Sequence, residues 1–247
     1  MAGGLCGALL MLVLQAPAHW LAAGVYKASS GHVLLAEPRG TVWRGSAQLV
    51  LQGGANSKDA TALPGRTSWQ LQPVWDGIRA QIQAPCCTPA PLQLRARPRW
   101  GGGQLSIQDS QTQWPAALLA GLGTPWNTVQ AQGQLTLATQ GLSVEWAQGR
   151  PAITGQARLE ALQMSSRLST LQPMGSYRIT FNGGPVPSLQ LDTIDGALQL
   201  TGSGTWVGAR LRFTGEASAA PEREAALANL LNIIGRRNGS RSLITVG

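Results

Sequence analysis

The chain has 247 residues and a mass of 25.9 kDa, and 43% of its residues are hydrophobic, so it is long enough to bury a sizeable core. Only 12% of the residues are charged, yet the apolar content excludes a disordered chain. There are two histidines, and His19 lies inside an apolar N-terminus, so a catalytic triad or an imidazole metal site would rest on His32 alone. We therefore expect no enzyme, no metal site and no cofactor.

The formal net charge is +8, which raises the question of a nucleic-acid partner. Most basic residues are isolated arginines between apolar residues, and the local clusters are residues 95–99 and 236–241. No interleaved aromatic residues accompany these clusters as a stacking motif would require. We interpret the charge as a solvated face and expect no nucleic-acid partner and no small-molecule substrate.

No residue from Ala2 to Tyr26 has a charged side chain, and Leu5 to Leu14 is densely apolar. Continuing through Val25 reaches the roughly 20 apolar residues that a membrane-spanning helix needs. We therefore predict a transmembrane anchor over residues 1–26, with a periplasmic body over 27–247. The alternative is a cleaved signal peptide, because Ala16-Pro17-Ala18 has the small-x-small form of a cleavage site.

Period-two alternation of apolar and polar residues dominates after Gly40. Ile78, Ala80 and Ile82, for example, alternate with arginine and glutamine. The pattern predicts about a dozen half-buried strands separated by Gly or Pro turns. One apolar and one polar face indicate a mainly β protein built as a curved antiparallel sheet or a sandwich-like domain. Two sheet halves would meet near residues 101–127.

Two segments favour helix. A short one is expected over residues 114–120. The stronger one is residues 221–235, in which an apolar face has the spacing i, i+3, i+4, i+7. That face consists of Leu227, Leu230, Leu231 and Ile234. We expect this amphipathic helix to cover part of the apolar face of the sheet as a lid.

Three arginines follow this helix: Arg236, Arg237 and Arg241. They are candidates for contact with a protein partner or with anionic headgroups. Arginine near a helix C-terminus is also favourable in itself, so the two interpretations remain open.

Cys86 and Cys87 are adjacent, and in an oxidising compartment they would form a vicinal disulfide or pair with another chain. No second Cys pair or His lies at metal-ligand spacing, which argues against zinc. A vicinal bridge closes almost no loop, so we expect the pair to be dispensable for folding.

Several strings in this order resemble protein N of the bacterial type II secretion system. They are GTVWRG at 40–45, GLGTPWN at 121–127, MGSYRITF at 174–181, GALQLTGSGTW at 196–206 and the ending from Leu227 to Gly247. The resemblance implies a single-pass inner-membrane protein whose bulk is periplasmic. It also implies an accessory role in the inner-membrane platform, near the secretin and the bitopic platform proteins, and no catalytic residues.

Two other functions fit the same residues. A curved sheet with one apolar face would cradle an acyl chain as a periplasmic lipid-binding or lipid-transport groove. A secreted β-sandwich adhesin would require cleavage after Ala18. An apolar face closed by the terminal helix favours a packed core, whereas an open groove favours lipid.

Overall fold

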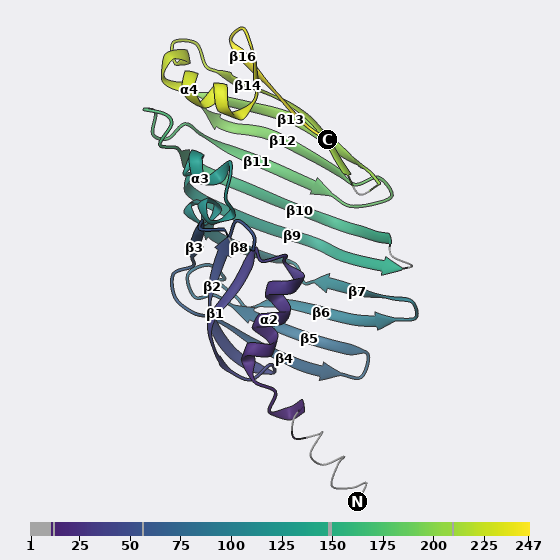
Figure 1. The fold of residues 1–247 in the computed structure, drawn as a ribbon. Helices are drawn as coiled ribbons and strands as arrows, with labels where there is room; N and C mark the ends of the chain where they lie inside the picture. Colours follow the sequence, from purple (N-terminus) through teal and green to yellow (C-terminus); the bar gives the residue numbers. More distant parts are fainter. Residues whose placement is uncertain (1–10, 12, 56, 148–149, 209) are drawn as a thin grey trace, which may run out of the picture.

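The structure, a computed structural model, describes residues 11, 13–55, 57–147, 150–208 and 210–247 (Figure 1). It is mainly β and contains one antiparallel 16-stranded sheet, which confirms the predicted class and the single-sheet alternative. The strands of the first half are β1 (Val33–Gly40), β2 (Arg44–Gln52), β3 (Ala60–Ala62), β4 (Thr67–Val74), β5 (Gly77–Gln83), β6 (Leu92–Arg99), β7 (Gly102–Ile107) and β8 (Ser110–Pro115).

The strands of the second half are β9 (Gln132–Ala147), β10 (Arg150–Ser165), β11 (Gly175–Asn182), β12 (Ser188–Gly196), β13 (Leu198–Val207), β14 (Arg210–Ala219), β15 (Arg236–Asn238) and β16 (Arg241–Val246). The helices are α2 (Ala18–Ala28), the 3-10 helix η1 (Ala116–Leu122), α3 (Trp126–Val129) and α4 (Glu224–Ile234).

The strand order follows the chain closely. From β4 to β7 and from β9 to β14, each strand pairs with its predecessor in the sequence. β7 pairs with β9, so the hydrogen-bonded sheet continues across the predicted break at 101–127. β3 and β8 lie off the main path, beside β2 and β9, and β16 separates β14 from β15. Whether the two halves are separate folding units stays a prediction.

One apolar face extends over the whole sheet, as the alternation predicted. In the first half, Ile82 lies opposite Leu92, and Leu105 lies opposite Val144. The register keeps this face continuous into the second half, where Leu159 lies opposite Ile179. Directly opposite side chains of an antiparallel pair point to the same face, so these pairs form continuous apolar rows.

Aromatic rings lie against glycines of the neighbouring strand on this face. The ring of Trp146 lies against Gly103, where an added Cβ would be 3.1 Å from the ring, and Trp69 and Phe213 lie in the same way against Gly45 and Gly202. The absence of a side chain on the glycine makes room for the ring, so a single-layer sheet can bury a large aromatic residue. Phe213 and Trp69 are accordingly only 8% and 7% exposed.

The anchor helix predicted over 1–26 is not found in that form. Residues 1–10 and 12 lie outside the described residues, and a helix, α2, begins only at Ala18 because Pro17 is in an extended conformation. Ala18 and Ala22 are buried against β1, β2 and β4, so α2 belongs to the folded body. Among the described residues, no helix combines the length and hydropathy that crossing a bilayer requires.

The predicted C-terminal helix is confirmed, with a later start. Glu222 has a positive φ of 68° and Arg223 is the N-cap, so α4 begins at Glu224 instead of beside Pro221. The short helix predicted over 114–120 is displaced: Trp114 and Pro115 end β8, and η1 begins at Ala116.

Candidate functional site

Among the residues that the structure describes, helices cover the two ends of the apolar face and leave its middle without a helical cover. α2 packs over β1, β2 and β4, and α4 packs in the cluster of the C-terminal strands, with η1 contributing its Ala116 (Figure 1). Between them, Leu94, Leu105 and Ile153 lie outside the three core clusters and remain half-buried. Ile78 is 41% exposed on the same face. The face is therefore part packed core and part accessible apolar surface.

The four residues of the predicted lid lie together on one face of α4. Leu227 and Leu231 are fully buried, Leu230 is 3% exposed, and Ile234 is half-buried beside the same cluster. The hydroxyl of Ser242 in β16 donates to the carbonyl of Leu231 at 2.6 Å, which joins the helix to the sheet. A functional role of these residues as a lid stays a prediction.

The three predicted arginines belong to the β15–β16 hairpin, and all are exposed. Arg237 lies opposite Ser242, which faces α4, whereas Arg236 lies opposite Leu243 on the other face. Arg241 shares that other face, and its Nη1 is 3.2 Å from Glu216 Oε1. The hairpin therefore divides the arginines between two faces, and their role in partner contact stays a prediction.

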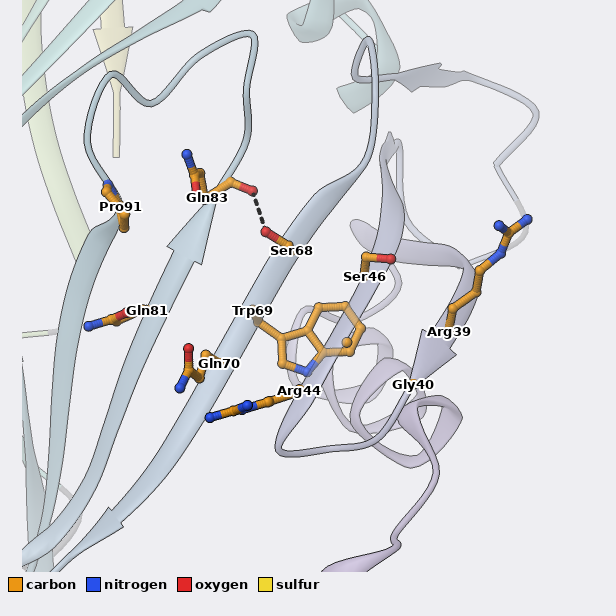
Figure 2. A pocket seen from close by; sticks show the side chains of 11 residues that line it. Arg39, Gly40, Arg44, Ser46, Ser68, Trp69, Gln70, Gln81, Gln83 and Pro91 are labelled. Atoms are coloured by element: carbon orange, nitrogen blue, oxygen red, sulfur yellow. Dashed lines mark hydrogen bonds between the residues drawn. The ribbon is translucent and has the colours of Figure 1, made fainter.

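An open groove, which the sequence pattern did not predict, lies on the polar face near the first strands. It has a volume of about 520 Å³. Figure 2 shows Arg44, Gln70 and Gln81, from three neighbouring strands, along its wall. These residues are directly opposite one another in β2, β4 and β5, and only the strand register brings them together. Their donors suit an acceptor-rich polar group.

The Arg95–Arg97–Arg99 series lies on the polar face of β6. Arg95 Nη2 donates to both carboxylate oxygens of Asp76 at 2.7 and 2.8 Å, and this hydrogen bonding holds the Asp76 pKa below its usual value. Arg97 Nε lies 2.8 Å from Asp76 Oδ2, a charge contact without hydrogen-bond geometry. Arg99 pairs with Glu145 at 3.1 Å. Two cations on Asp76 leave positive charge in excess.

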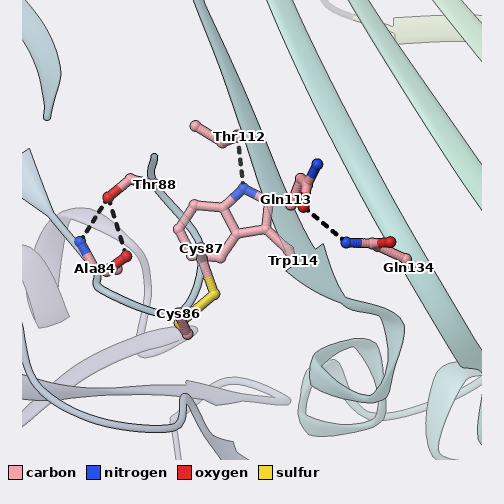
Figure 3. The surroundings of a disulfide bond; sticks show 8 residues. All are labelled: Ala84, Cys86, Cys87, Thr88, Thr112, Gln113, Trp114 and Gln134. Carbon is pink, nitrogen blue, oxygen red and sulfur yellow. Dashed lines mark hydrogen bonds between the residues drawn. A yellow bond between two sulfur atoms is a disulfide. The ribbon is translucent and has the colours of Figure 1, made fainter. Parts of the chain in front are cut away.

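Cys86 and Cys87 form the vicinal disulfide that was one of the two predicted alternatives (Figure 3). Cys86 is exposed, while Cys87 is 2% exposed in a small cluster with Leu63, Ala84 and Leu118. Their roles therefore differ: Cys87 fills space in a core, and Cys86 contributes only the bridge.

We expect Cys86→Ser, which breaks the bridge, to melt like the parent, because a vicinal bridge constrains almost no loop. Cys86→Ser/Cys87→Ser should still unfold cooperatively but with a lower midpoint, since a buried hydroxyl costs about 1–3 kcal/mol. Calorimetry of both variants measures this. A non-cooperative melt of the single variant would show that the bridge itself holds the fold.

No group of three or more metal-ligating side chains occurs in the part of the chain that the structure describes. Compared with known proteins, the chain matches the family model of type II secretion system protein N over residues 31–244. No curated protein and no solved structure matches it.

Proposed function

Because the chain belongs to the type II secretion system protein N family, we propose that it is an accessory component of the inner-membrane platform. In this role it supports export of folded proteins through contacts with the secretin and the bitopic platform proteins, not through catalysis. The observation that carries the proposal is the family match, which covers most of the described sheet.

We further propose that the N-terminal apolar segment stays attached and holds the chain at the inner membrane, with the sheet in the periplasm. The backbone N–H of Val42 donates to the carbonyl of Ala16 at 2.8 Å, and Ala16 and Ala18 are buried. Cleavage after Ala18 would remove these contacts, which favours an uncleaved segment. Because α2 packs on the sheet, the part available to the membrane ends near Gln15.

The platform role is tested by co-purification of the full chain with its secretion system. We expect Arg236→Gln/Arg237→Gln/Arg241→Gln to reduce recovery of the platform proteins, because the variant removes three exposed cations from the end of the sheet. Its melting midpoint should stay close to that of the parent, since an exposed pair such as Arg241–Glu216 contributes only about 0–1 kcal/mol.

A matched control changes three exposed arginines elsewhere to glutamine: Arg39, Arg158 and Arg167. It alters the net charge equally and should leave recovery unchanged. Equal recovery of both variants would mean that the hairpin arginines are only solvated side chains. Failure of the parent to co-purify with any secretion protein would contradict the platform role itself.

A second candidate function, a lipid-binding groove, is favoured by the uncovered middle of the apolar face around Leu94, Leu105 and Ile153. Half-buried aliphatic side chains between two helix-covered ends form a surface that an acyl chain would cover. Mass spectrometry of lipids that co-purify with the chain tests this. Absence of lipid from Leu105→Glu but not from the parent would support the groove, and absence from both would reject it.

A further inference from the structure

One long edge of the sheet consists of hairpin turns, here named the tip edge. The strands are antiparallel, so the β4–β5, β6–β7, β11–β12 and β13–β14 turns all emerge on the same side, opposite the side that holds α3 and α4 (Figure 1). The β1–β2 turn belongs to this edge as well. β2 is antiparallel to β4, so β2 starts on the side of the sheet toward which β4 runs before the β4–β5 turn.

Tryptophan occupies two neighbouring tips. Val74 pairs with Gly77 and Arg99 pairs with Gly102, so both turns contain two residues, one of which is a tryptophan. Trp75 is 94% exposed and Trp100 is fully exposed. The two turns are two strand spacings apart, which is about 10 Å. Because Trp75 is almost fully exposed, packing does not require an aromatic residue at its position. Trp69, on the same hairpin, is by contrast 7% exposed.

Positive charge surrounds these tips. The described arginines within a few residues of these two tips are Arg79, Arg95, Arg97 and Arg99. The described carboxylates in the same region are Asp76 and Glu145, and both are already paired with arginine. The excess of guanidinium groups is complementary to an anionic surface.

Two described residues of the N-terminal segment, Val13 and Pro17, are bonded to the same edge. Trp43, in the β1–β2 turn, donates from its indole Nε1 to the carbonyl of Val13 at 2.7 Å. Pro17 forms a bridge with Thr41 of the same turn. Val13 and Pro17 are thus held close to the tip edge, at the end where β4 and β5 lie.

We propose that the β4–β5 and β6–β7 tips form a membrane-contact surface that binds anionic phospholipid headgroups, with Trp75 and Trp100 at the bilayer interface. The inference rests on the membrane attachment proposed above and adds the surface that faces the lipid. Indole rings favour the headgroup level, and arginines near an anionic leaflet add electrostatic attraction. A bilayer accepts protruding, separated rings without shaped pockets, whereas a protein partner would need a matching pocket for each.

The test uses the full chain reconstituted in vesicles of phosphatidylcholine with phosphatidylglycerol that carries bromine, a quencher of indole fluorescence, near the top of its acyl chains. We expect the tryptophan fluorescence to be quenched in these vesicles. Quenching should be much weaker in vesicles made of brominated phosphatidylcholine alone, and it should also be much weaker at high salt. Trp75→Phe/Trp100→Phe should lose most of the anion-dependent quenching. The matched control is Trp126→Phe, which removes an exposed indole of α3 on the opposite side and should keep it.

The outcomes separate this surface from the anchor. If the chain resists carbonate extraction but the parent and Trp75→Phe/Trp100→Phe are quenched equally, the contact surface is overturned and the attachment stands. A chain that carbonate removes, but whose Trp75 and Trp100 were quenched beforehand, supports the surface and rejects the anchor. Quenching that is independent of phosphatidylglycerol, protection of both indoles by platform proteins instead of lipid, or no vesicle binding overturns the proposal.

Discussion

Replacing Leu227 and Leu231 of α4 by alanine should lower the free energy of unfolding by about 4–10 kcal/mol, since each large-to-small change in a core costs about 2–5 kcal/mol. Both side chains are fully buried, and the sheet beneath them is only one layer thick, so no second layer fills the cavity. The free energy of unfolding of a whole domain is about 5–15 kcal/mol, so the double variant should be close to unfolding. Urea unfolding of purified protein measures the change.

The control for this prediction is Ile233→Ala on the same helix. Ile233 is 46% exposed, so its removal alters helix length and propensity little and creates no buried cavity. Its midpoint should stay near that of the parent. If the Leu227 and Leu231 variant also unfolded like the parent, α4 would be attached to the surface without contributing to the core.

Trp69→Ala should lower the free energy of unfolding by about 3–5 kcal/mol, because it removes a 7% exposed ring from the cluster that holds α2 on the sheet. The indole Nε1 also donates to the carbonyl of Val42 at 3.0 Å, which fixes the β1–β2 turn. Loss of the ring should therefore loosen both α2 and the attachment of residues 13–17. Denaturant unfolding reports the stability, and protease cleavage after Lys27 reports the detachment of α2.

Trp75→Ala provides the comparison, since Trp75 lies on the same hairpin but is 94% exposed. In detergent solution it should leave stability and the cleavage of α2 unchanged. Equal destabilisation by both tryptophan changes would contradict the view that the apolar face, and not the tip edge, holds this part of the fold together.

Side-chain alternation predicted most of the sheet because it follows directly from strand geometry. Ile78, Ala80 and Ile82 share one face in the sequence pattern and in the structure. The helical spacing of Leu227, Leu230 and Leu231 was equally informative. The start of α4 was missed because the positive φ of Glu222 depends on the turn after β14, not on composition.

Residues 18–26 were assigned to the anchor, although α2 packs on the sheet, because an uncharged sequence has the same composition whether it lies in lipid or against protein. The distinguishing signal was the spacing of small residues, Ala18 and Ala22, which lets a helix approach a sheet closely. The groove at Arg44, Gln70 and Gln81 and the division of the C-terminal arginines both depend on strand register. Register between distant strands is not visible in a single sequence.

The near-sequential strand order has a consequence for how the molecule is made. Where each strand pairs with the one synthesised just before it, every closure involves a short loop and a small entropy cost. From β9 to β14, a chain that emerges N-terminus first would therefore extend its sheet one strand at a time, with the newest strand as the growing edge. The sequential order ends there, because β16, the last strand made, pairs with β14 and leaves the earlier β15 at the edge. The three residues of β15 offer too short a ladder for another strand to join.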